Sequence, residues 1–190
     1  MSTLPKAHLT PEQYLEIERN AERKSEYYAG EMFAMAGASK EHGLITVNLV
    51  TVLHNQLRRS ACRTFVADMR VNIPATGLYT YPDIVVACGE LKFIDAEVDT
   101  LLNPVIIAEI LSPSSEAYDR GRKFEHYQSI PTLNEYLLVA QDRIHVDLYT
   151  RQPAGAWLLT SANQLTDTLA LPSIHCSVPL AELYEGLQLV

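Results

Sequence analysis

The chain has 190 residues and is 47% hydrophobic and 20% charged, with a formal net charge of −8. This ordinary globular composition predicts one domain, residues 1–190, with a buried core. Its apolar runs are no longer than a strand, which excludes a membrane-spanning helix. The negative charge counts against broad electrostatic attraction to nucleic acid, though not against a local basic groove.

The first predicted elements are a helix and a hairpin. Thr10 can cap the helix, Pro11 suits its first position, and Gln13 lies where a capping box needs it. We expect this helix to end near Asn20. Two strand-like segments then flank Ala29-Gly30, which predicts the turn of a β-hairpin. The two strands of the hairpin are residues 25–28 and 31–35.

A longer helix and a series of strands follow. Ser39 caps the helix, which should run to about Arg59. The expected strands after it are residues 64–67, 70–73, 81–88 and 105–111. Another helix begins after Ser112 and ends near Ile130, before Pro131. The last expected elements are strands at 135–139, 144–150, 156–160 and 169–174 and a helical turn at 179–184. This order predicts an α/β or α+β fold in which helices pack on a mixed sheet.

The three cysteines, Cys62, Cys88 and Cys176, are widely spaced and fit no zinc-binding pattern. Their odd number argues against a disulfide framework, so we expect buried, reduced thiols. The polar segment 1–10 lacks the pattern of a signal peptide. Together these features predict a cytoplasmic protein.

Two carboxylates interrupt strongly apolar strands. Asp83 precedes the run 84–86, and Glu109 lies between the runs 105–108 and 110–111, 26 residues after Asp83. A carboxylate within a buried strand is costly unless something charged meets it. If the two strands lie side by side, both acids point at one spot. A hard cation such as Mg²⁺ needs an oxygen-rich spot of that kind.

Each acid also has a simpler explanation. Asp83 could simply be a turn residue just before a strand. Glu109 could simply be a solvated residue on the open face of an antiparallel sheet. The residues around Glu109 are apolar on both faces of the strand, which disfavours the solvated position. The sequence therefore favours a functional carboxylate at Glu109.

The helix after Glu109 carries Asp119, Lys123 and Tyr127 at intervals of four residues, so all three share one face. They could form only a surface ion pair. Alternatively, Lys123 projects over the strand of Glu109, where its ammonium would orient the attacking water or stabilise charge on a phosphate. The spacing leaves both explanations open.

Other charged residues are weaker candidates. Glu41 and His42 suit the first turn of a helix, but Glu41 could supply a further acidic ligand and His42 could contact phosphate or act as a base. Asp68 is a weaker candidate still, because it could serve only as the partner of Arg70 in an ion pair. Two basic clusters are either solvated faces or phosphate-binding groups: Arg58, Arg59, Arg63 and Arg70, and Arg120, Arg122 and Lys123.

Together these residues resemble the PD-(D/E)XK nuclease superfamily, and more narrowly a largely uncharacterised family of restriction-endonuclease-like proteins. The matching segments are residues 81–86, 109–114, 118–124, 127 and 130–136. The resemblance extends from the first helix to about Tyr149. It implies a restriction-endonuclease-like fold, with a central mixed β-sheet flanked by helices and, here, an N-terminal helix and β-hairpin.

The resemblance also implies a metal site. Asp83 matches the first acid of the motif and Glu109 the second. Both would bind Mg²⁺ or Mn²⁺, with the carbonyl of Ile110 as an extra ligand. Glu41 matches the acid that many members carry on the preceding helix.

This chain departs from the motif at one position. The motif places its lysine two residues after Glu109, where this chain has Leu111. Lys123 is the candidate replacement, because relatives sometimes move this lysine to the neighbouring helix. The residues expected to carry catalysis are therefore Asp83, Glu109, Lys123 and Glu41.

The first functional hypothesis is a Mg²⁺-dependent endonuclease that hydrolyses phosphodiester bonds in DNA. The metal on Asp83 and Glu109 would lower the pKa of a bound water, and Lys123 would position that water or stabilise the transition state. A homodimer is consistent with this, because cutting both strands of a duplex needs two sites. The alternative is a catalytically inactive nuclease-fold module that binds nucleic acid or protein, which the net charge and Leu111 favour.

Overall fold

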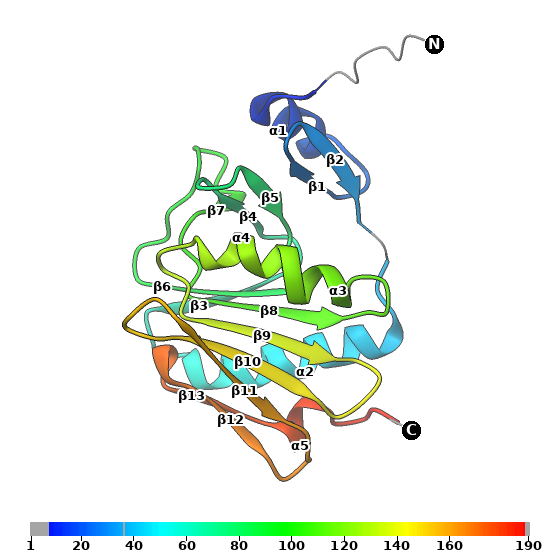
Figure 1. Cartoon of the computed structure of the whole chain (residues 1–190), viewed down its shortest axis with the longest axis vertical. Helices are drawn as coiled ribbons and strands as arrows, with labels where there is room; N and C mark the ends of the chain where they lie inside the picture. Colours follow the sequence, from blue (N-terminus) through cyan, green and yellow to red (C-terminus); the bar gives the residue numbers. More distant parts are fainter. Residues whose placement is uncertain (1–7, 36, 189–190) are drawn as a thin grey trace.

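The structure is a computed structural model that describes residues 8–35 and 37–188 (Figure 1). Residues 1–7, which belong to the polar segment considered above, lie outside the described residues. A smaller sheet with helix α1 lies above a larger central sheet, which has helices on both of its faces (Figure 1).

The N-terminal helix and hairpin form as predicted. Helix α1 (Pro11–Arg19) begins with a complete capping box, in which the Gln13 N–H donates to Thr10 Oγ1 and the Thr10 N–H donates to Gln13 Oε1. Strands β1 (Ser25–Tyr28) and β2 (Glu31–Ala34) pair antiparallel around a turn at Ala29 and Gly30. Both turn residues have positive φ, a conformation that glycine adopts without strain.

The hairpin belongs to the smaller of the two main sheets, whose other strands the sequence did not assign to it. The strand order of this smaller sheet is β2-β1-β5-β4-β7. Its other members are β4 (Arg70–Ile73), β5 (Leu78–Thr80) and β7 (Thr100–Leu101). The single strand expected over 81–88 is wrong at its start, because β6 begins only at Ile84. The preceding strand, β5, belongs to the smaller sheet, and Pro82, which has no N–H, lies between the two.

The central sheet has the order β11-β10-β9-β8-β6-β3. Its strands are β3 (Cys62–Val66), β6 (Ile84–Cys88), β8 (Ile106–Leu111), β9 (Glu135–Ala140), β10 (Val146–Arg151) and β11 (Trp157–Ala162). Strands β8 and β9 pair in parallel and the other neighbours pair antiparallel. This is the mixed sheet that the sequence predicted.

Helices cover both faces of the central sheet. Helix α2 (Lys40–Leu57), capped by Ser39, packs against one face. The other face is covered by a segment built from α3 (Glu116–Tyr118), a π-helical turn (Asp119–Lys123) and α4 (Phe124–Gln128). The expected helix after Ser112 is therefore present, but one of its turns is wider than an α-helical turn.

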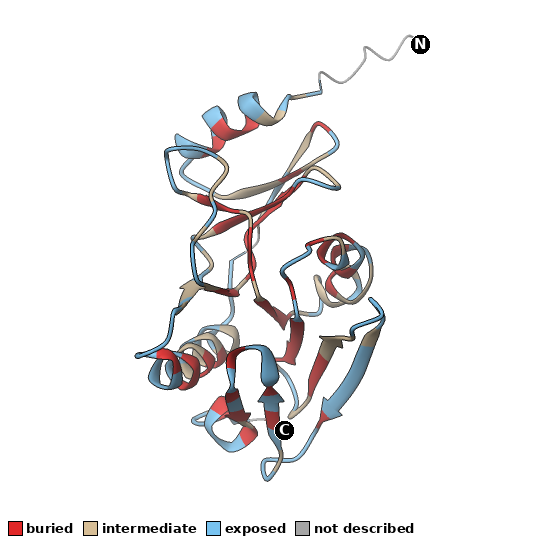
Figure 2. Ribbon diagram, turned by 90° about the vertical axis from the view of Figure 1, so that its left-hand side faces the viewer, coloured by how far each residue is buried: buried red, intermediate tan, exposed pale blue. Residues whose placement is uncertain are grey.

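Alternation along the strands of the central sheet divides the core in two. In β8, Ile106, Ala108 and Ile110 pack with helix α2, while Ile107 and Leu111 pack with the α3–α4 side. Buried residues accordingly follow the strands and the inner sides of the helices, and exposed residues lie on the outside (Figure 2). Glu109 shares the side of Ile107 and Leu111, so it enters an apolar layer.

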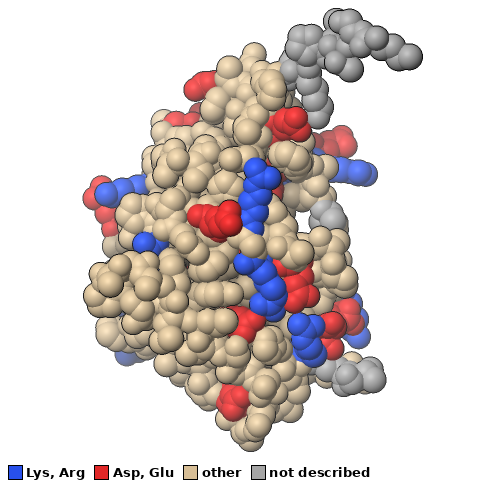
Figure 3. All heavy atoms as spheres, viewed as in Figure 1, with Lys and Arg blue, Asp and Glu red and all other residues tan. Residues whose placement is uncertain are grey.

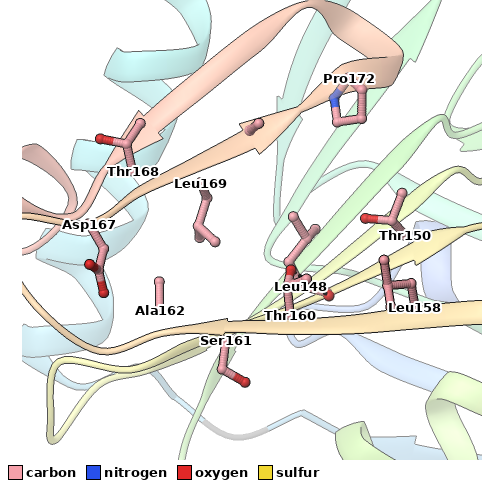
Figure 4. A pocket seen from close by; sticks show the side chains of 11 residues that line it. Leu148, Thr150, Leu158, Thr160, Ser161, Ala162, Asp167, Thr168, Leu169 and Pro172 are labelled. Atoms are coloured by element: carbon pink, nitrogen blue, oxygen red, sulfur yellow. Dashed lines mark hydrogen bonds between the residues drawn. The ribbon is translucent and has the colours of Figure 1, made fainter.

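The C-terminal part forms a small ribbon against the α2 side of the core. It consists of β12 (Thr168–Leu171), a short 3-10 turn (Pro172–Ile174), β13 (Cys176–Pro179) and α5 (Leu180–Leu183). A groove of about 510 Å³ lies between this ribbon and β10–β11 (Figure 4). No helix within residues 8–35 and 37–188 is both long and apolar enough to cross a membrane.

The expectation of three reduced thiols is wrong for two of the cysteines. Cys62 in β3 and Cys88 in β6 are direct partners in the antiparallel register, with Cα atoms 3.9 Å apart, and they form a disulfide. Cys176 is a free, buried thiol, as expected. The sequence could not show the disulfide, because nothing in it indicated that these two strands are neighbours.

Candidate active site

Glu109 meets a cation and a hydroxyl within the apolar layer. It is 3% exposed, and its Oε1 lies 2.9 Å from Lys123 Nζ. The Tyr127 hydroxyl donates to the same oxygen over 2.7 Å. Lys123 and Tyr127 both come from the helical segment that covers this face of the sheet. The structure therefore brings Lys123 to Glu109, which is one of the two explanations that the spacing left open.

Lys123 is the centre of a buried cluster of acids. Its side chain is 7% exposed, and Nζ also lies 3.3 Å from Glu26 Oε1 and 3.5 Å from Asp119 Oδ1. The Thr80 hydroxyl donates to the same oxygen of Glu26. A surface ion pair between Asp119 and Lys123 is thus the wrong explanation, because both residues are buried.

Glu26, on hairpin strand β1, is the residue of this cluster that the sequence did not single out. It lies 83 residues before Glu109 in the chain and belongs to no motif considered above. The only available signal was an acid within the aromatic strand Glu26-Tyr27-Tyr28. Tyr27 faces the core around α1, so Glu26 and Tyr28 face the other way.

Asp83 lies at the edge of the same region. Its Oδ2 accepts the backbone N–H of Ile110 over 2.7 Å, which ties the start of β6 to the strand that carries Glu109. Its Oδ1 lies 3.0 Å from His42 Nε2 in the first turn of helix α2. The Ser39 cap, which accepts the His42 N–H, fixes that turn. Asp83 is thereby held by two elements.

Burial and mutual charge shift the pKa values within the cluster. Burial, together with the nearby Asp119 and Asp83, raises the pKa of Glu109 to about 8, although Lys123 acts in the opposite direction. Burial also raises the pKa of Asp119. Burial pulls the pKa of Lys123 down, but the surrounding acids outweigh it, and that pKa stays well above its ordinary value. The ammonium is therefore charged, and it faces more than one carboxylate.

A divalent metal ion would fit this chemistry. Three carboxylates contact the one ammonium, those of Glu26, Glu109 and Asp119, and Asp83 lies close enough to act on the charge of Glu109. Both contacts of Glu109 described above use Oε1, so neither of them occupies Oε2. Within residues 8–35 and 37–188, no group of three or more His, Cys, Asp or Glu is arranged to hold a metal. A site with two carboxylates and several waters suits Mg²⁺, which keeps much of its hydration shell.

The two remaining predicted site residues are Glu41 and Ile110. Within the described chain, Glu41 makes no hydrogen bond or ion pair with Asp83 or Glu109, and it is the neighbouring His42 that contacts Asp83. The Ile110 N–H is used by Asp83, and the role of its carbonyl as a ligand stays a prediction.

The two basic clusters considered in the sequence are only partly on the surface: Arg58, Arg59 and Arg63 are exposed, whereas the other cluster members except Arg122 are buried or half-buried. Arg70 is 3% exposed and donates to the Tyr81 hydroxyl. The ion pair expected between Asp68 and Arg70 is also wrong, since Asp68 pairs with Lys24. Arg120 pairs with Glu116 and Asp147. Arg122 stays exposed, with its guanidinium 5.2 Å from the centre of the Tyr28 ring.

Known sequences resemble nearly the whole chain. The sequence model of the Uma2 family, described as "Putative restriction endonuclease", matches residues 11–181. Two proteins of Synechocystis sp. (strain ATCC 27184 / PCC 6803 / Kazusa) are similar to this chain. "Uncharacterized protein slr1290" is 39% identical over 183 residues, 96% of this chain and 95% of that protein. "Uncharacterized protein sll1609" is 40% identical over 152 residues, 80% of this chain and 86% of that protein.

A solved structure shares the fold. The crystal structure of a "putative nuclease belonging to DUF820" from Anabaena variabilis ATCC 29413 matches with a TM-score of 0.74. The match covers 93% of this chain and 97% of that chain at 19% sequence identity. It confirms the restriction-endonuclease-like fold that the sequence predicted. Since the family model spans most of the residues and slr1290 is similar along nearly its whole length, the chain belongs to the Uma2 family of restriction-endonuclease-like proteins.

Proposed function

We propose that this protein is a DNA endonuclease that depends on Mg²⁺ or Mn²⁺. The observation that carries the proposal is the contact of 2.9 Å between Lys123 Nζ and Glu109 Oε1. It places an ammonium beside the second acid of the motif even though Leu111 occupies the usual lysine position. The descriptions of the family and of the Anabaena protein as nucleases support the same class of reaction.

The residues of the site have distinct roles in this proposal. Asp83 and Glu109 would hold the metal, which when bound would lower the pKa of a water and neutralise charge on the scissile phosphate. Lys123 would present its ammonium to the attacking water or to the phosphate oxygens. Tyr127 and Glu26 hold Glu109 and Lys123 in place, so the ammonium does not need to reorganise during the reaction.

A catalytically inactive module is the competing function. Leu111 is buried in the core on the α3–α4 side, so that position offers no ammonium. The net charge of −8 also disfavours extensive contact with phosphates. In the proposed nuclease, Lys123 would replace the ammonium that is missing at position 111. Metal binding and DNA cleavage separate the two functions.

Metal binding is the first arm of the experiment. Calorimetric titration with Mn²⁺ should show binding to the wild type and a large loss of affinity in Asp83→Asn and Glu109→Gln, because each removes a charged ligand. Asp68→Asn is the matched control, since Asp68 pairs with Lys24 outside the cluster. Absence of Mn²⁺ binding in the wild type would sink the nuclease proposal.

Cleavage of circular DNA, supplied both as duplex plasmid and as a single-stranded circle, is the second arm. Lys123→Met keeps the length of the side chain but removes the ammonium, and we expect about 10²-fold slower nicking or more. Lys92→Met is the control, because Lys92 is exposed and follows the end of β6 opposite to Asp83. Metal binding with unchanged nicking in Lys123→Met would remove Lys123 from the proposed role. A homodimer, which sedimentation would detect, is required only if both strands of a duplex are cut.

A further inference from the structure

The hairpin places an aromatic ring beside the active site. Phe33 on β2 lies directly opposite Glu26 on β1 in the antiparallel register. Residues paired in this way project to the same face, with Cβ atoms roughly 5 Å apart. Glu26 reaches Lys123 on that face, yet Phe33 is 49% exposed. An open phenyl ring therefore adjoins the acid that contacts the catalytic lysine.

A cation lies on the same side of the hairpin. Tyr28 alternates with Glu26 along β1, and its ring contacts His126 of helix α4. The guanidinium of Arg122 lies over the Tyr28 ring at 5.2 Å from its centre, and Arg122 is exposed. The surface beside the site thus combines an exposed aromatic face with a positive charge that an aromatic ring holds in position.

The distribution of charge bears on whether duplex or single-stranded DNA binds at this surface. Binding of duplex DNA relies on many Lys and Arg contacts to phosphates. On the face shown in Figure 3, blue and red side chains are interspersed and form no broad positive patch. A single strand is bound through stacking of its bases on aromatic rings as well as through phosphate contacts, and a paired base within a duplex has no free face to offer.

We propose that the substrate is single-stranded DNA, and that the base of a nucleotide beside the scissile phosphate stacks on Phe33 while Arg122 contacts a neighbouring phosphate. This inference rests on the proposed nuclease function, since it assigns the substrate class of the same site. Phe33 is a specificity-determining residue in this arrangement, and the hairpin is the element that presents it.

The test measures binding of fluorescein-labelled oligonucleotides by anisotropy, with Ca²⁺ in place of Mg²⁺. Phe33→Ala should weaken binding of a single-stranded oligonucleotide about tenfold, the effect of losing one base stack. Phe33→Trp should restore the affinity. Leu159→Ala is the matched control, because Leu159 is 48% exposed on the distant strand β11, and it should bind like the wild type. Circular dichroism of each variant confirms folding.

Two results would overturn the proposal: equal affinity of Phe33→Ala and wild type for the single strand, or tighter binding of the wild type to the matching duplex. These results are distinguishable from failure of the nuclease function. If metal binds and plasmid is nicked while Phe33→Ala has no effect, the substrate assignment alone is wrong. If Phe33→Ala weakens binding but no cleavage or metal binding occurs, the stacking surface stands and the nuclease function is wrong.

Discussion

At the scale of single residues, the site depends on placing charge within an apolar layer. Glu109 alternates with Ile107 and Leu111, so its carboxylate is buried among side chains that cannot solvate it. Lys123 and Tyr127 supply the compensating contacts. A buried ion pair of this kind contributes little net stability. A role in function therefore explains the buried acid better than a role in stability does.

Tyr127→Phe tests how far the hydroxyl supports this arrangement. Tyr127 is fully buried and its hydroxyl donates to Glu109 Oε1 over 2.7 Å. We expect the free energy of unfolding to fall by about 1 kcal/mol, the usual net value for a hydrogen bond. Urea unfolding measures the change. Tyr149→Phe removes a half-buried hydroxyl from β10 as a control, and a similar loss in both variants would contradict the explanation.

The sequence predicted the site unevenly, for a physical reason. Asp83 and Glu109 could be identified because each stands beside a run of apolar residues, and Lys123 because helical spacing is regular. Glu26 could not be identified, since its contact with Lys123 depends on how the hairpin lies against the helix. Such contacts between distant segments leave no local pattern.

At the scale of elements, helix α1 is tied to a distant loop by one ion-pair cluster. Arg19, in its last turn, donates to Asp95 and Asp99, each over 2.8 Å. These acids lie between β6 and β7, so the cluster joins the N-terminal helix to the connection of the two sheets. Hydrogen bonds from Arg19 lower the pKa of Asp99 to about 2.

This lowered pKa predicts a pH dependence of stability. Because the folded protein favours the charged form of Asp99, the contribution is complete above the ordinary pKa of 3.8 and is lost as the pH falls toward about 2. Asp99→Asn should therefore cost up to about 1 kcal/mol at neutral pH, a modest value for a partly exposed pair. The difference from wild type should shrink between about pH 4 and pH 2 in urea unfolding.

A control locates the effect in the Arg19 cluster. Asp142 is 64% exposed and pairs only with its neighbour Arg143 among the ion pairs described, so Asp142→Asn should change stability by less than about 0.5 kcal/mol at any of these pH values. A loss for Asp99→Asn that persists unchanged at the lowest pH would show that the carboxylate charge is not the cause.

The elements that the sequence missed include the two shortest strands, together with β13. Strands β5 and β7 have three and two residues, too few for a period of two to be recognisable. The capping box of α1 and the hairpin turn, in contrast, are encoded by adjacent residues and were predicted correctly. Which short strand joins which sheet depends on contacts made only in the folded chain.

At the scale of the whole molecule, a disulfide fastens one edge of the central sheet. Cys62 and Cys88 join edge strand β3 to β6, at the end of β6 away from Asp83. The bond closes a loop over a sequence separation of 26 residues. It therefore restricts the unfolded chain more than it shapes the active site.

Reduction of this disulfide should lower the free energy of unfolding by about 3.5 kcal/mol, the chain-entropy value for a loop of this length. Urea unfolding with and without dithiothreitol measures the loss, and in Cys62→Ala/Cys88→Ala dithiothreitol should have no effect. Thiol titration of the denatured, unreduced protein provides the independent check. It should count one thiol, Cys176, and a count of three would contradict the disulfide.

The π-helical turn over Asp119–Lys123 sets the helical register of the segment that covers Glu109. Such a turn contains one residue more than an α-helix would need. Deleting a single residue there, such as Gly121, would rotate Asp119 by about 100° relative to Lys123. The two residues would become i,i+3 neighbours, which can still contact each other, but Asp119 and the residues before it would turn relative to Lys123 and Tyr127. The register of this turn therefore decides from which direction the Asp119 carboxylate approaches Lys123 Nζ, while Lys123 and Tyr127 keep their places beside Glu109.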